Sequence, residues 1–196
     1  MIDLNLAKFK KNLELHHNLY PEIPLDNKLL ESIFERSLFG DVKHDTGSHS
    51  IGYDLIVSNK KISVKSGKYK SNKNVLVFSS HRTTTHNTIE EKIKFIDEDH
   101  FDYQYNFAKV DDWKKTKVYK LIVFKKEQLK VGDLKFEKND SGWLGENDNI
   151  RVSIKEKMSD QVWYTVNLNN VKPLKIMDFS VPQYDLEYLS NEVTKS

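Results

Sequence analysis

The chain has 196 residues, enough for one domain with a buried core. Hydrophobic residues make up 38% and charged residues 31%, which is typical of soluble globular proteins and excludes a wholly disordered one. The chain has no cysteine, which excludes a disulfide framework, a thiolate metal site and a cysteine nucleophile. No apolar run is long enough to cross a membrane, and the N-terminus lacks a signal-peptide hydrophobic region, so we expect a soluble cytoplasmic protein.

Positive charge is concentrated in one part of the chain. The formal net charge is +2, yet the stretch between Asp54 and Glu90 contains several Lys residues, one Arg and no acidic residue. A near-neutral protein that gathers its positive charge locally often binds a polyanion. A solvated lysine-rich surface is the alternative, because nearly all basic residues of the chain are lysine.

Two helices are predicted at the start of the chain. Residues 3–18 have helical composition, and two prolines that follow end that segment. Asp26 is a suitable N-cap for a second helix with helically spaced apolar residues, which Gly40 is expected to end. Glu31 and Glu35 lie one turn apart beside this apolar stripe.

Strands are predicted in the middle of the chain. Residues 53–57 and 62–66 read as a hairpin, and residues 74–80 read as a strand buried on both faces. A polar segment follows, and a capping box formed by Thr88 and Glu91 predicts a third helix.

The order of these elements predicts the fold class. Three consecutive short strands indicate an antiparallel meander, and the helix that follows is a crossover that makes residues 117–124 a parallel partner. Residues 150–155 and 162–168 alternate as a later hairpin, connected by residues 158–161. We therefore expect an α/β (α+β) fold, with a mixed central β-sheet flanked by helices. The expected single domain covers residues 1–196, with its core at about 26–124 and a β-rich C-terminal extension at about 125–180.

The first hairpin brings an acid and a lysine together. A two-residue turn at Asn59-Lys60 would pair Asp54 with Lys65, with their Cβ atoms roughly 5 Å apart. Ser63 would share their face, because alternate strand residues share a face. A surface ion pair worth under ~1 kcal/mol is the plain alternative.

The order of elements around this pair resembles the PD-(D/E)xK nuclease superfamily, which includes most type II restriction endonucleases. The motif would lie on Tyr53-Asp54 and Ser63-Val64-Lys65, within a core of helix, three strands, helix and strand. Two residues depart from the motif. Tyr53 stands where proline is usual, and Ser63 stands where a second carboxylate is usual, although a hydroxyl is a poor Mg²⁺ ligand.

The resemblance implies Mg²⁺-assisted phosphodiester hydrolysis. Asp54 would hold the metal together with a backbone carbonyl near Val64 and an acid from the preceding helix. Lys65 would orient or deprotonate the attacking water and stabilise charge at the phosphate. Glu35 is preferred as the recruited acid over Glu31, and Asp45 is a third candidate.

The resemblance also implies double-stranded DNA as the substrate, a homodimer that matches a palindromic site, and a cognate DNA methyltransferase in the same restriction-modification system. Arg82 is expected to discriminate base sequence, because its planar fork suits guanine, unless it only braces its loop. The other expected DNA contacts are phosphate-attracting lysines and polar residues of the segment after residue 80, namely Lys68, Lys70, Lys73, His81, Thr84, His86 and Asn87.

The sequence is also compatible with other functions. A repair or junction-resolving nuclease of the same superfamily, an inactive DNA-binding module and a β-rich interaction protein are each compatible with the sequence. His44, Asp45 and His49 have the residue types of a Zn²⁺ site, but a polar loop explains them as well. The three tryptophans are expected to be core or interface residues.

Overall fold

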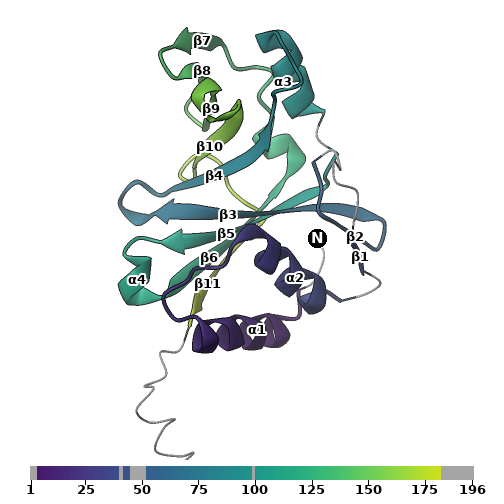
Figure 1. The fold of residues 1–196 in the computed structure, drawn as a ribbon, viewed down its shortest axis with the longest axis vertical. Coiled ribbons are helices and arrows are strands. Elements are labelled where there is room, and N and C mark those ends of the chain that lie inside the picture. Colours follow the sequence, from purple (N-terminus) through teal and green to yellow (C-terminus); the bar gives the residue numbers. More distant parts are fainter. Residues whose placement is uncertain (1–3, 40–41, 45–51, 99, 182–196) are drawn as a thin grey trace, which may run out of the picture.

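The computed structural model describes residues 4–39, 42–44, 52–98 and 100–181 (Figure 1). Its helices and helical turns are α1 (Leu6–Leu19), α2 (Asn27–Ser37), η1 (Ser71–Lys73), α3 (Ile89–Asp97), α4 (Trp113–Thr116), η2 (Lys126–Leu129) and η3 (Glu156–Met158). Its strands are β1 (Val42–His44), β2 (Leu55–Val57), β3 (Lys60–Lys70), β4 (Val75–Arg82), β5 (Tyr103–Val110), β6 (Val118–Lys125), β7 (Phe136–Asn139), β8 (Gly142–Glu146), β9 (Ile150–Lys155), β10 (Gln161–Asn167) and β11 (Lys175–Ser180).

All described strands belong to one mixed, open sheet, and the fold is α+β. The sheet runs in the order β11-β6-β5-β3-β4-β10-β9-β8-β7, while β2 pairs with the start of β3 and β1 pairs with β2. The strands β3 and β5 are parallel, and every other pair is antiparallel among the described strands. None of the helices in the described ranges is long and apolar enough to cross a membrane.

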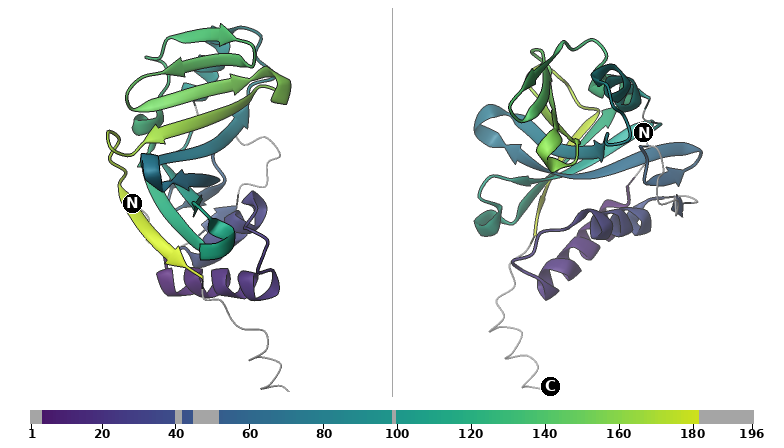
Figure 2. Two further views of the ribbon diagram at one scale, coloured as in Figure 1. Left: turned by 90° about the vertical axis from the view of Figure 1, so that its left-hand side faces the viewer. Right: turned by 45° about the horizontal axis from the view of Figure 1, so that its top comes forward.

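Two hydrophobic cores lie on opposite faces of the sheet. The helices α1 and α2 cover the first face, where Phe9 and Phe34 pack with Ile62 and Val64 of β3 (Figures 1 and 2). On the second face, α3 and the C-terminal strands enclose a core that includes Phe78. Because side chains alternate along a strand, β3 contributes Ile62 and Val64 to the first core and directs its odd-numbered residues to the second face.

Capping residues explain where the helices begin. The side chain of Asp26 accepts a hydrogen bond from Leu29 N, as predicted, and Thr88 and Glu91 form the predicted capping box of α3. Two neighbouring backbone N–H groups, those of Asn87 and Thr88, donate to the Glu91 carboxylate and lower its pKa. The helix α2 ends at Ser37 rather than at Gly40, which lies outside the described residues.

The first hairpin has a different register from the predicted one. The turn lies at Ser58-Asn59, both of which have positive φ, so Val57 pairs with Lys60 and Leu55 with Ile62. The prediction failed because Asn is tolerated in the left-handed region, which allows a type I′-like turn one residue earlier. The shift moves each partner by two residues, so it leaves Asp54 on the same face as Lys65.

The parallel partner of β3 was wrongly predicted. It is β5, with Ile62 opposite Tyr103 and Lys65 opposite Asn106, whereas β6 is antiparallel to β5. The residues of β5, YQYNFAKV, carry polar side chains at positions that become buried, and this composition hides the strand from a hydrophobicity pattern. The strands β7, β8 and β11 were also missed.

The remaining predictions are mixed. The strands β9 and β10 form the predicted hairpin, although their connection begins with η3. The strand β4 is not buried on both faces: Leu76 and Phe78 are buried, while Val75 and Val77 are only partly covered. The first face of the sheet at β4 lies beyond the helices α1 and α2, which explains this difference (Figure 2). The loop predicted over residues 40–52 contains the short strand β1.

Candidate active site

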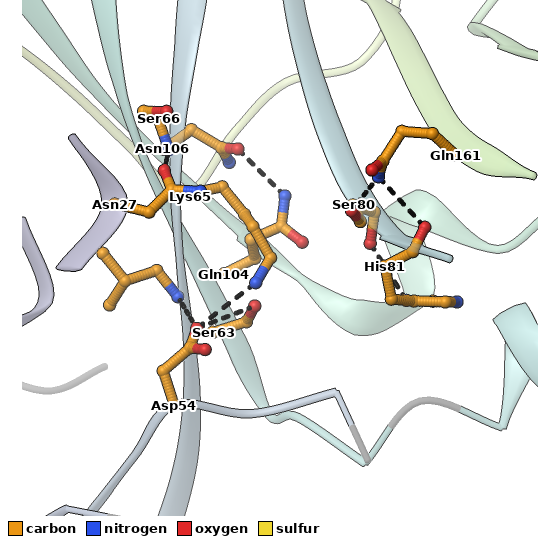
Figure 3. Close-up of polar contacts among 11 residues, drawn as sticks. Asn27, Asp54, Ser63, Lys65, Ser66, Ser80, His81, Gln104, Asn106 and Gln161 are labelled. Carbon is orange, nitrogen blue, oxygen red and sulfur yellow. Dashed lines mark hydrogen bonds and ion pairs between the residues drawn. The ribbon is translucent and has the colours of Figure 1, made fainter. Parts of the chain in front are cut away.

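Asp54 and Lys65 meet on the second face of the sheet, as the sequence predicted (Figure 3). The Lys65 ammonium lies 3.3 Å from Asp54 Oδ2, and their side chains are 18% and 20% exposed. The same oxygen accepts hydrogen bonds from Ser63 Oγ at 3.4 Å and from Val64 N at 2.6 Å. Three donors therefore fix one carboxylate oxygen in a partly buried position.

The pair sits where β3 loses its neighbour. Strand β4 pairs with β3 only up to Gly67 opposite Phe78, and β2 pairs with β3 only up to Ile62. The backbone N–H of Val64 donates to Asp54 in this gap, and that of Ser66 donates to Asn27 Oδ1 at 3.2 Å. Side chains thus replace a neighbouring strand here, because a buried N–H group needs an acceptor.

Buried amides, which were not predicted from the sequence, lie next to the pair on β5. Gln104 is paired in register with Ser63, and Asn106 with Lys65. Both amides are buried, and Gln104 Nε2 donates to Asn106 Oδ1 at 2.9 Å (Figure 3). Ser63 is also buried, at 1% exposure, so a polar layer underlies Lys65. Alternating polar residues in YQYNF were the available signal.

The candidate acids of α2 lie along one line of the helix. Asn27, Glu31 and Glu35 are spaced four residues apart, so they follow one face of α2. Asn27 touches the edge of β3 at Ser66, and both glutamates are partly buried and engaged in polar or electrostatic interactions.

A complete acid cluster is not formed by the described side chains. Among the described residues, no group of three or more His, Asp or Glu side chains lies close enough together to hold a metal ion. Asp45 and His49 lie outside the described residues, and so does the side chain of His44. The suggested His44-Asp45-His49 site is therefore not described.

The segment that begins at His81 makes more side-chain contacts than predicted. His81 and Arg82 belong to β4. The ring centroid of Phe95 on α3 lies 5.0 Å from that of His81 and 4.3 Å from that of His86. Arg82 Nε donates to Gln161 Oε1 at 3.4 Å. Arg82 nevertheless stays exposed, and so do Thr84 and Asn87.

The predicted phosphate-binding lysines do not share the face of the candidate site. Lys68 and Lys70 alternate with Lys65 along β3, so they point to the first face of the sheet. Lys73 is exposed on η1, at the turn between β3 and β4. The structure thus brings Asp54, Ser63, Val64 and Lys65 together and separates them from these three lysines.

Comparison with known proteins gives no relative of this chain: no family model, no curated protein sequence and no solved structure matches it.

Proposed function

We propose that this protein is a Mg²⁺-dependent endonuclease that hydrolyses phosphodiester bonds in double-stranded DNA. The observation that carries the proposal is the contact between Asp54, directly before β2, and Lys65 of β3, at the gap where β4 leaves β3. The order α2, β1, β2, β3, β4, α3, β5 supports it, because apart from the short extra strand β1 it follows the helix, three strands, helix and strand of the PD-(D/E)xK core.

The donor set fits a metal ion that the substrate helps to bind. Mg²⁺ is commonly held by one or two carboxylates, with water and substrate phosphate oxygens completing its octahedral shell. Asp54 offers the carboxylate, and Val64 directs its carbonyl to the same side as its N–H, toward Asp54. When bound, the metal would polarise the phosphate and lower the pKa of a water molecule.

Lys65 would stabilise negative charge as it develops on the phosphate. Its ammonium is held beside Asp54 in a partly buried site, where electrostatic interactions are stronger than in bulk water. On the neighbouring strand, the buried Asn106 is paired in register with Lys65 and accepts a hydrogen bond from Gln104. A fixed cation in this position requires no reorganisation during the reaction.

Glu31 is the better-placed recruited acid. From Asn27 beside Ser66, α2 leads to β1 and hence toward the hairpin end of β3 (Figure 1). Glu31 is one helical turn from the contact between Asn27 and the edge of β3, and Glu35 is two turns from it. This placement favours Glu31 over the Glu35 preferred from sequence.

A type II restriction endonuclease is the finer form of this proposal. It would act as a homodimer on a palindromic site, alongside a cognate methyltransferase. An inactive DNA-binding module is the second candidate, and Ser63 favours it. Its hydroxyl is buried and hydrogen-bonded to Asp54, so it offers neither charge nor access to a metal ion.

Incubation of the purified protein with plasmid DNA, with Mg²⁺ or with EDTA, separates these functions. Discrete fragments that form only with Mg²⁺ are expected for a restriction endonuclease. Random nicking would instead assign a nonspecific nuclease. Plasmid binding without cleavage at any Mg²⁺ or Mn²⁺ concentration would overturn catalysis and support the binding module.

A further inference from the structure

The second half of β3 borders a hollow on the first face of the sheet. This hollow has a volume of about 340 Å³, and we call it the lysine groove. Its lining includes Lys68, Lys70, Val77, Lys109 and Trp163. A second hollow, of about 490 Å³, shares Lys68 and Lys109 with it and extends along α4. Asp111, Asp112, Lys114 and Lys115 also line this second hollow.

The lysines of this groove make no ion pair among the described residues, namely Lys68, Lys70 and Lys109. No acidic residue lines the first hollow, although Asp111 and Asp112 line the second one. Lys68 and Lys109 are directly paired in the β3–β5 register. Partial burial of Lys109, and then its repulsion by Lys68, lower the pKa of Lys109. Like charges held together in a concave surface favour an anionic ligand from outside.

Other lysines of the fold contrast with these three. Lys60 and Lys120 of the sheet pair with Asp102 and Asp178, and Lys92 of α3 pairs with Asp160. Each of these is neutralised within the fold. The missing acids of the lysine groove are therefore a local feature and do not simply follow from a lysine-rich composition.

We propose that the lysine groove binds single-stranded nucleic acid. Lysines spaced along a groove match successive phosphates, and an aromatic side chain offers a surface for a base. Trp163 supplies that ring, half-buried in the groove, and the ammonium of Lys155 lies 5.3 Å from its centre. A duplex keeps its bases stacked inside, where Trp163 cannot reach their faces, so the groove selects single strands.

This binding is separate from the proposed hydrolysis. Lys65 and Lys68 point to opposite faces of β3, and the groove uses neither Asp54 nor a metal ion. Binding measured in EDTA therefore tests the groove alone, and plasmid cleavage with Mg²⁺ tests the catalytic proposal alone.

The first test measures the affinity of a fluorescein-labelled twelve-nucleotide oligo-dT in EDTA, by fluorescence anisotropy at several salt concentrations. The double variant Lys68→Ala/Lys109→Ala should bind at least tenfold more weakly than the wild type. The slope of log K against log salt should fall in magnitude by about 1.4, because two phosphate contacts are lost. The matched control, Lys130→Ala/Lys135→Ala, removes two exposed lysines outside the groove and should bind within twofold of the wild type.

Equal losses in the two double variants would overturn the groove as the binding site. The second test compares oligo-dT with a duplex of equal length and with inorganic polyphosphate, using the wild type and Trp163→Phe. We expect the single strand to bind best, and Trp163→Phe to weaken oligo-dT more than polyphosphate. A preference for duplex or for polyphosphate would contradict the proposal. Circular dichroism of each variant confirms that it is folded.

Discussion

The two halves of strand β3 use lysine in opposite ways. In the first half, Lys65 is held by Asp54, and the edge of the strand is bound by side chains where β4 departs. In the second half, β4 is paired with β3, and Lys68 and Lys70 have no acidic partner among the described residues. The two halves belong to one strand and differ chiefly in where the counter-charge lies.

This difference separates two roles for a positive charge. A lysine beside a fixed acid is oriented, so it can act on a single atom of a ligand. Lysines without acids attract a polyanion over a distance, with a strength that depends on salt. We therefore propose chemistry at the first half of β3 and binding at the second half.

The largest expected effect concerns the acid that completes the first half. Glu31→Gln should reduce Mg²⁺-dependent cleavage at least about a hundredfold, because it removes the charge of the acid that we propose completes the metal site. Glu35→Gln, one turn away, is the matched control and should lose less than about tenfold. Cleavage rates over a series of Mg²⁺ concentrations measure both variants. Normal cleavage by both would show that the second acid comes from elsewhere.

The next-largest effect concerns the stability of the fold and the buried histidine His17. Tyr119 is paired with Lys109 across β5 and β6, and its hydroxyl lies 3.0 Å from His17 Nε2. Burial, and then the charge of His16, lower the pKa of His17 to about 4 from 6.5. Between these values the unfolded chain binds a proton that the folded one does not. Stability should thus fall by up to about 3 kcal/mol as pH drops through this window.

Urea unfolding at several pH values measures this loss. His17→Gln should flatten the dependence between pH 6.5 and pH 4, while His100→Gln, which removes an exposed histidine, should leave it unchanged. An identical pH dependence in the wild type and in His17→Gln would rule out His17 as its source.

A third prediction concerns the junction between the halves. A Cβ atom at Gly67 would lie 2.9 Å from the carbonyl oxygen of Val77 and 3.3 Å from Leu76 Cδ1. Gly67→Ala should therefore destabilise the protein by about 1–3 kcal/mol, because backbone of β4 must move. Ser66→Ala is the neighbouring control, with an expected change under about 0.5 kcal/mol. Thermal unfolding compares them, and equal melting temperatures would contradict this close approach of the strands.

The smallest expected effect concerns sequence discrimination next to the first half. Arg82→Ala should cost roughly 1–3 kcal/mol on the cleaved site and much less on unrelated DNA. Arg151→Ala, which removes an exposed arginine paired with Glu146, should change neither. Competition binding with cognate and scrambled duplexes measures the difference. An equal loss on both duplexes would show that Arg82 only stabilises its segment through the hydrogen bond with Gln161.

The sequence predicted the contact between Asp54 and Lys65 but not the register that produces it. The contact survived because a shift by two residues preserves the face of a strand. The helix caps at Asp26 and Thr88 were also predictable, because capping depends on a few neighbouring residues. Local chemistry therefore carried the correct predictions.

Features that depend on distant pairing were missed. The strand β5 carries Gln104 and Asn106 into the interior, where they hydrogen-bond each other and Asn106 donates to the carbonyl oxygen of Ile122 on β6. No local pattern shows that such polar residues are buried. The lysine groove was missed for a similar reason, because Lys109 and Trp163 join Lys68 only after β5 and β10 take their places in the sheet.

Plasmid cleavage by Lys65→Ala tests the proposed catalytic role of Lys65. Lys61→Ala is the control on the same strand. Lys61 lies over the ring of Tyr53 and does not contact Asp54, so its variant should cut within about threefold of the wild type. We predict that Lys65→Ala loses at least about a hundredfold in cleavage rate with Mg²⁺ while it stays folded and binds DNA. Cleavage by Lys65→Ala within about tenfold of the wild type would contradict the assignment of this site.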